Sequence, residues 1–179
     1  MSKSLFKVVL LGDPSVGKTS IRKKYMGRGF STSYLPTMGC DFAVVNKNRE
    51  GQSIELQIWD LAGQPSFELL IPRFISNSSG AIFVFDLTRR ETFVNLAKWI
   101  KKFKEINEKK LKNIPLYIVG NKSDLEDWEV KQQEVDDYAE YVTQKLDLNE
   151  VEVKTYLTSA KNGENINELF EHAVDTLIN

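Results

Sequence analysis

Three apolar runs and one mixed run are spaced along the chain and are separated by polar segments. Runs of this kind are typical of parallel strands that are buried on both faces. Two further segments, Asp41–Asn46 and Ser53–Asp60, predict a hairpin around Lys47–Gln52. The four runs are Phe6–Leu11, Gly80–Leu87, Leu116–Gly120 and Lys154–Thr158.

Amphipathic segments lie between these runs and predict helices. One helix is expected directly after the first run. Three others are indicated by apolar residues at helical spacing, and the order of elements predicts an open α/β sheet with helices on both faces. Those residues are Leu96, Trp99, Ile100 and Phe103, then Val135, Tyr138, Ala139 and Val142, then Ile166, Leu169, Phe170, Ala173 and Val174.

Composition agrees with one domain over residues 1–179, because 41% hydrophobic content can bury one sizeable core. The net charge of −1 gives no bulk attraction to nucleic acid. Cys40 is the only cysteine, which excludes an intrachain disulfide and fits a reducing compartment. No apolar run is long enough to span a bilayer, so we expect no membrane span.

A glycine-rich segment, Gly12–Thr19, directly follows the first run and reads Gly-Asp-Pro-Ser-Val-Gly-Lys-Thr. Such a turn lets successive backbone N–H groups point into one concavity that an anion fills. Gly12 and Gly17 permit the backbone angles this requires. Lys18 can reach the β- and γ-phosphates, and the Thr19 hydroxyl is a hard oxygen ligand for Mg²⁺. The segment predicts a phosphate loop.

A second motif, Asn121–Asp124, follows the apolar run Leu116–Val119. The Asp124 carboxylate can accept two parallel N–H bonds from the edge of guanine, whereas adenine has no matching pair of donors. Asn121 can bridge the base and the phosphate loop, and the Lys122 stem can lie along the base plane. The motif therefore predicts a guanine nucleotide.

A third motif, Asp60–Gln64, ends the strand-like run Ile54–Trp59. Asp60 can hold Mg²⁺ through water, and the Gly63 amide can donate to a γ-phosphate oxygen. Gln64 can orient an attacking water.

A fourth motif, Thr158–Lys161, closes the last run, where the Ala160 amide can meet the guanine oxygen. With all four motifs in this order, the chain resembles a Ras-superfamily small GTPase over essentially its whole length. The resemblance implies a three-layer P-loop fold, a small G-domain. Its sheet has six mostly parallel strands with one antiparallel strand, and helices cover both faces.

Thr37–Phe42 resembles the first switch of the Rab branch. The resemblance implies that Thr37 senses the γ-phosphate through Mg²⁺, that Phe30 packs against guanine and that Tyr34 covers the phosphates. Three aromatic positions match those that Rab proteins present to effectors. Trp59 is well placed for contact because Ile54, Leu56 and Ile58 occupy the other face, whereas Phe42 and Phe74 fit either contact or core.

The implied activity is slow hydrolysis of GTP to GDP, with GTP and GDP as ligands and Mg²⁺ as cofactor. Effectors, exchange factors and GTPase-activating proteins would bind the switch segments Phe30–Cys40 and Gly63–Ser76. The implied catalytic residues are Gln64 and Lys18, the metal ligands are Thr19, Thr37 and Asp60, and the nucleotide contacts are Asp13, Ser15, Val16, Gly17, Lys18, Thr19, Ser20, Phe30, Tyr34, Thr37, Gly63, Asn121, Lys122, Asp124, Ser159, Ala160 and Lys161.

The chain departs from the family at Pro14, where a small residue is usual. Proline has no N–H, and its ring would lie near the γ-phosphate, where it could crowd a partner's arginine or Gln64. Nucleotide binding should survive, since the resemblance implies that the critical amides run from Ser15 to Ser20. Gln64 also precedes Pro65, which favours an extended residue before it and restricts the movement of Gln64.

Two further departures concern length. The stretch from Asp124 to Ser159 is longer than usual and predicts either a longer fourth helix or an exposed contact loop. The sequence ends at Asn179 without the C-terminal cysteines that carry a lipid in Rab proteins. We therefore expect a cytoplasmic protein without a lipid anchor, which associates with membranes only if a lipidated tail has been removed.

Two alternative functions remain open. The first is an interaction scaffold that binds GTP with little or no hydrolysis, which Pro14 and Pro65 favour. The second is an ATP-using P-loop enzyme such as a small kinase, against which Asp124 argues.

Overall fold

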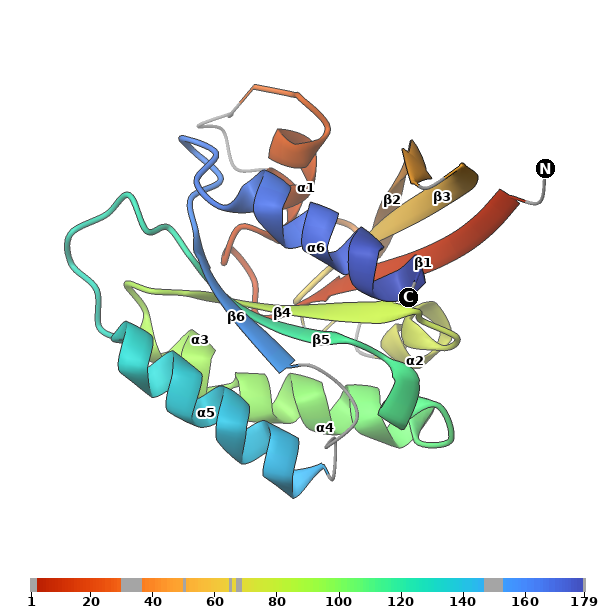
Figure 1. Cartoon of the computed structure of the whole chain (residues 1–179). Coiled ribbons are helices and arrows are strands. Elements are labelled where there is room, and N and C mark those ends of the chain that lie inside the picture. The colour runs from red at the N-terminus through yellow and green to blue at the C-terminus, as the bar shows by residue number, and fades with distance from the viewer. Residues whose placement is uncertain are drawn as a thin grey trace.

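The structure is a computed structural model that describes residues 3–29, 37–49, 51–64, 66, 69–146 and 153–178. A six-stranded sheet with the order β2-β3-β1-β4-β5-β6 forms its centre (Figure 1). β2 pairs antiparallel with β3, and the other pairs are parallel. The strands are β1 (Lys3–Leu11), β2 (Cys40–Arg49), β3 (Gln52–Leu61), β4 (Gly80–Asp86), β5 (Leu116–Asn121) and β6 (Val153–Thr158).

Helices cover both faces of the sheet, and Figure 1 shows α1 and α6 on one face and α3, α4 and α5 on the other. No helix within the described ranges combines the length and hydropathy needed to cross a bilayer. The helices are α1 (Lys18–Tyr25), α2 (Ile71–Ile75), α3 (Arg90–Val94), α4 (Leu96–Asn107), α5 (Gln132–Lys145) and α6 (Ile166–Ile178), with a 3₁₀ turn η2 (Leu111–Asn113).

Alternate side chains along β1 point to opposite faces of the sheet and contribute to two separate core clusters. Val8 and Leu10 belong to the buried cluster that α6 covers, whereas Val9 and Leu11 belong to the cluster that α4 and α5 cover. Successive strand residues point to opposite faces, so the continuous apolar segment Val8–Leu11 contributes to both layers. The predicted α/β fold is confirmed.

The hairpin is longer than the sequence analysis predicted. β2 continues to Arg49 and pairs there with Gln52, so most of the expected connection Lys47–Gln52 lies in the ladder. Polar residues are compatible with this position because β2 is an edge strand with one unpaired side. The short helices α2 and α3 were also missed, since five residues are too few for a helical period to stand out.

All four motifs follow the carboxyl ends of strands. β1 leads into Gly12, β3 ends at Leu61, β5 ends at Asn121 and β6 ends at Thr158. Parallel strands bring these ends to one edge of the sheet, where open α/β folds bind ligands.

Candidate functional site

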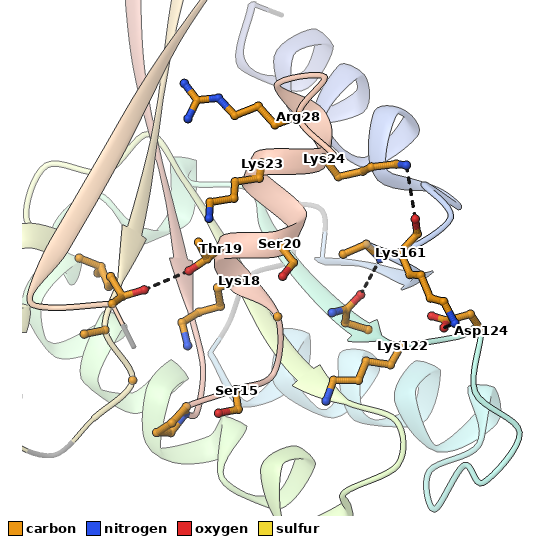
Figure 2. Close-up of a pocket in the computed structure, with 18 of the residues that line it drawn as sticks. Ser15, Lys18, Thr19, Ser20, Lys23, Lys24, Arg28, Lys122, Asp124 and Lys161 are labelled. Atoms are coloured by element: carbon orange, nitrogen blue, oxygen red, sulfur yellow. Dashed lines mark hydrogen bonds and ion pairs between the residues drawn. The ribbon is translucent and has the colours of Figure 1, made fainter. Parts of the chain in front are cut away.

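A cavity of about 560 Å³ lies at this edge, with walls from the Gly12–Thr19 loop, α1 and the segments after β3, β5 and β6 (Figure 2). It brings together most of the residues that the sequence analysis selected. Those in its lining are Ser15, Gly17, Lys18, Thr19, Ser20, Thr37, Gly63, Gln64, Asn121, Lys122, Asp124, Ala160 and Lys161.

Two glycines shape the loop after β1. Gly12 has a φ of +144°, and a Cβ there would lie 2.1 Å from the Val84 carbonyl oxygen. Gly17 has a φ of +102°, and its Cβ would lie 2.1 Å from Asn121 Nδ2. Any side chain at either position would therefore be strained and would collide with a neighbouring segment.

Lys18 is buried at the start of α1, and its ammonium group contacts the beginning of the phosphate loop. Lys18 Nζ donates hydrogen bonds of 2.7 Å each to the carbonyl oxygens of Gly12 and Asp13. Burial lowers the pKa of Lys18 to about 8, although the carboxylates of Asp60 and Asp13 oppose this shift. An anion beside the ammonium would replace the solvation that burial removes.

Three oxygen-bearing side chains from separate segments meet beside Lys18. Thr19 Oγ1 lies 3.0 Å from Thr37 Oγ1 and 2.5 Å from Asp60 Oδ2. Asp60 is fully buried, and its Oδ1 has no hydrogen-bond partner among the described residues. Burial raises the pKa of Asp60, while the Thr19 hydrogen bond and the charges of Lys18 and Arg22 oppose the shift. Hard oxygens with an unused acceptor fit Mg²⁺.

Asn121 connects three segments at the base of the cavity. Its Nδ2 donates to the Val16 carbonyl at 2.8 Å. Its Oδ1 accepts from the Ala160 N–H and from Thr158 Oγ1, both at 3.2 Å. Asn121 therefore contacts the phosphate loop in the structure, and its contact with the guanine base stays a prediction.

Asp124 lies at the end of the cavity away from Lys18, beside the segment that follows β6 (Figure 2). Asp124 Oδ1 accepts a 2.6 Å hydrogen bond from Ser159 Oγ, and Oδ2 lies 3.6 Å from Lys161 Nζ. The Ser159 hydroxyl orients the carboxylate. Lys122 Nζ lies 2.5 Å from Asp86 Oδ2.

The Asp13 side chain does not face the cavity. Its Oδ2 accepts from Asn95 Nδ2 at 2.7 Å and its Oδ1 from Trp99 Nε1 at 2.9 Å. Asp13 is not among the residues that line the cavity, and its side chain anchors the loop to α4 instead. The Val16 side chain is likewise buried in the core. The Ser159 hydroxyl donates its hydrogen bond to Asp124. Phe30, Tyr34 and Pro65 lie outside the described residues.

The sequence analysis missed several residues of the cavity wall. Lys23, Lys24, Arg28 and Gly29 come from α1 and the turn after it, and Leu125 follows Asp124. The sequence did contain a signal for the residues on α1. This helix begins within the phosphate loop, so its exposed side borders any ligand that the loop binds. Figure 2 shows Lys23 and Arg28 extending to one side of α1 and Lys24 extending to the other side, toward Lys161.

Three aromatic side chains form a stack beside the cavity, and we call Phe42, Trp59 and Phe74 the aromatic stack. The Phe42 and Trp59 rings are 5.1 Å apart, the Trp59 and Phe74 rings are 6.3 Å apart, and Lys7 Nζ lies 4.4 Å from the Trp59 ring. Phe42 is 51% exposed, which excludes a core role for it, whereas the other two are partly buried.

Comparison with known families agrees with this geometry. A family model described as the Ras family matches residues 7–179, which covers all four motifs, β1 from Lys7 onward and the other five strands in full. Members of this family are GTP-binding switches that use Mg²⁺ and generally hydrolyse GTP. The match and the motif-lined cavity together lead to one conclusion: the chain belongs to the Ras family of small GTPases.

Proposed function

We propose that this protein is a Rab-type switch that hydrolyses GTP to GDP and phosphate. The observation that carries the proposal is a single cavity with Lys18 near one end and Asp124 near the other (Figure 2). A buried ammonium beside loop amides suits a polyphosphate. A carboxylate held by Ser159 suits the two N–H donors of guanine, and adenine would leave that charge unpaired.

In the proposed reaction, water attacks the γ-phosphorus in line with the leaving group. A bond forms from the water oxygen to phosphorus, and the bond to the β–γ bridging oxygen breaks, so that its electron pair stays with GDP. The proton that the water gives up passes to a phosphate oxygen or to solvent. Gln64 orients the water through its side-chain amide. Lys18 stabilises the charge on the transferring group and the leaving oxygen.

The cluster of hydroxyl and carboxylate oxygens supports a role for Mg²⁺. Thr19 and Thr37 would hold the ion directly and Asp60 would hold it through water, consistent with the unpartnered Asp60 Oδ1. Bound Mg²⁺ supplies charge neutralisation at the phosphate oxygens.

Switching follows from the same contacts. Thr37 and Gly63 would contact the γ-phosphate, so its loss would release both switch segments. The aromatic stack spans β2, β3 and α2, and its Phe74 belongs to the second switch segment, which supports an effector surface of the Rab kind. Exchange factors and GTPase-activating proteins would bind the same region.

The decisive experiment identifies the bound nucleotide and its specificity. We expect GDP or GTP to co-purify with the protein, and ATP to fail to displace labelled GDP. Asp124→Asn should weaken GDP binding by about a hundredfold and favour xanthosine diphosphate, because the amide no longer accepts two N–H bonds. Displacement by ATP, or unchanged base preference in the variant, would contradict guanine recognition.

A second function, a GTP-bound scaffold with little hydrolysis, is favoured by Pro14. Pro14 and Gln64 line the same cavity, so the ring stands close to where the water would be oriented. Single-turnover assays on wild type and Gln64→Leu separate the two functions. A slower variant supports hydrolysis through Gln64, and equal rates support the scaffold.

A further inference from the structure

Arg89, which directly precedes α3, joins two segments that are far apart in the sequence. Its Nε donates to Asp86 Oδ2 at 3.0 Å, and its Nη2 donates to the Pro14 carbonyl oxygen at 3.0 Å. The planar guanidinium thus connects the end of β4 to the phosphate loop.

The contact with Pro14 sets the direction of one peptide unit. In a trans peptide the carbonyl and the next residue's N–H point in opposite directions. With the Pro14 carbonyl turned toward Arg89, the Ser15 N–H is turned away from Arg89. Ser15 lines the cavity and has a φ of 63°, a strained value for a residue other than glycine. Because Pro14 itself has no N–H, the Ser15 amide is the first that the loop offers after Asp13.

Asp86 anchors the guanidinium. It is fully buried, and its Oδ1 accepts from the Thr88 N–H at 3.0 Å and from Thr88 Oγ1 at 2.8 Å. Its Oδ2 is shared by Arg89 and by Lys122. Burial alone would raise the pKa of Asp86, but the hydrogen bonds from Lys122 and Thr88 outweigh it and hold the pKa below its ordinary value. Asp86 therefore stays ionised at neutral pH.

Together these contacts form a continuous path from Lys122 through Asp86 and Arg89 to Pro14. We infer that Arg89 is a positioning residue for the nucleotide, which holds the Ser15 amide toward the phosphates and couples the phosphate loop to the guanine-reading segment. The inference rests on the proposed function, since it concerns the same cavity.

The matched control is the next residue, Arg90. Its guanidinium also makes two contacts, with the Glu129 carbonyl oxygen at 2.9 Å and with Glu134 Oε1 at 2.5 Å. Neither contact touches the cavity lining or the phosphate loop.

The test measures release of a fluorescent GDP analogue into excess unlabelled GDP, in Mg²⁺, for wild type, Arg89→Gln and Arg90→Gln. Loss of a hydrogen bond from a charged donor should speed release from Arg89→Gln about tenfold and leave Arg90→Gln unchanged. The ³¹P NMR signal of the β-phosphate of bound GDP should shift only in Arg89→Gln. If that variant does not fold, Arg89→Lys, which keeps the charge without the planar fork, should show the same shift and about threefold faster release.

The outcomes separate the two proposals. If wild type binds no guanine nucleotide, the proposed function fails. If wild type binds GDP but the Arg89 variant has wild-type release, or faster release with an unshifted β-phosphate signal, or a change shared by the Arg90 variant, the positioning role is overturned while the function stands.

Discussion

Asn121 Nδ2 donates a hydrogen bond of 2.8 Å to the Val16 carbonyl oxygen across 105 residues of chain. The same side chain accepts from Ala160 N–H at 3.2 Å, and it is only 2% exposed. One buried side-chain amide therefore connects the phosphate loop, the end of β5 and the segment after β6.

Asn121→Ala should release GDP at least tenfold faster, because it leaves the Val16 carbonyl and the Ala160 N–H without their partner. Asn107→Ala is the matched control. Asn107 is also buried, but its Nδ2 donates to Ile75 and Phe103 carbonyls away from the cavity. Both variants should lower the melting temperature, and only Asn121→Ala should change the release rate. Wild-type release from Asn121→Ala would contradict the bridging role.

Gly63→Ala should slow GTP hydrolysis about tenfold to a hundredfold and leave GDP affinity within about threefold. A Cβ at Gly63 would lie 2.5 Å from the Gly12 carbonyl oxygen and 2.7 Å from the Pro14 nitrogen, which are backbone atoms that cannot turn away. The Gly63 backbone would then move away from the γ-phosphate position. Because GDP has no γ-phosphate, the affinity for GDP should change little. Gly29→Ala serves as control, because Gly29 lines the cavity and no heavy atom of the described residues lies within 4 Å of its Cβ position. The measurement is single-turnover hydrolysis, and equal rates for both variants would refute this explanation.

The Cys40 thiol should react slowly at pH 8. Burial, and then the charge of Asp60, raises its pKa from 9.0 to about 11, against the opposing charge of Lys7. The thiolate is the reactive form, so native protein should react with a disulfide reagent about a hundredfold more slowly than the denatured chain. The native rate should rise about tenfold per pH unit up to about pH 11. A native rate equal to the denatured rate would show that Cys40 is not shielded.

Glu171→Gln should lower the melting temperature by about 2 °C at pH 7. Glu171 on α6 accepts from Tyr25 Oη at 3.0 Å and Lys47 Nζ at 2.7 Å and also pairs with Arg49, so it ties α1 and β2 to α6. Burial alone would raise its pKa, but the Lys47 and Tyr25 hydrogen bonds hold it below 4.5.

A depressed pKa adds stability above the ordinary value of 4.5 and loses it as the pH falls through the lower folded value. The difference between wild type and Glu171→Gln should therefore shrink as the pH is lowered below 4.5. Glu140→Gln, an exposed change in the middle of α5 and away from a helix N-terminus, should show no pH-dependent difference. Thermal melts from pH 7 to pH 3 provide the comparison, and a constant difference would rule out the charge as its source.

Sequence reasoning succeeded where chemistry depends on short contiguous segments. The Gly12–Thr19 loop and the Asn121–Asp124 motif lie at one cavity as predicted, because each directly follows a strand and parallel strands end at one edge. It failed where a side chain has two possible environments. Nothing local shows that the Asp13 carboxylate turns to Trp99, or that Phe42 is half exposed while Phe74 packs on the core.

The sequence by itself determined the order of the strands and of the longer helices, the α/β fold and most residue types of the cavity. These depend on hydrophobic period and on motifs that contain their own turn chemistry. Only the tertiary structure decided that Arg89 donates a hydrogen bond to Pro14 over a 75-residue separation and that a side chain at Gly63 would collide with the Gly12 backbone. Such contacts arise when packing brings distant segments within a few ångströms, and no local pattern along the chain encodes that distance.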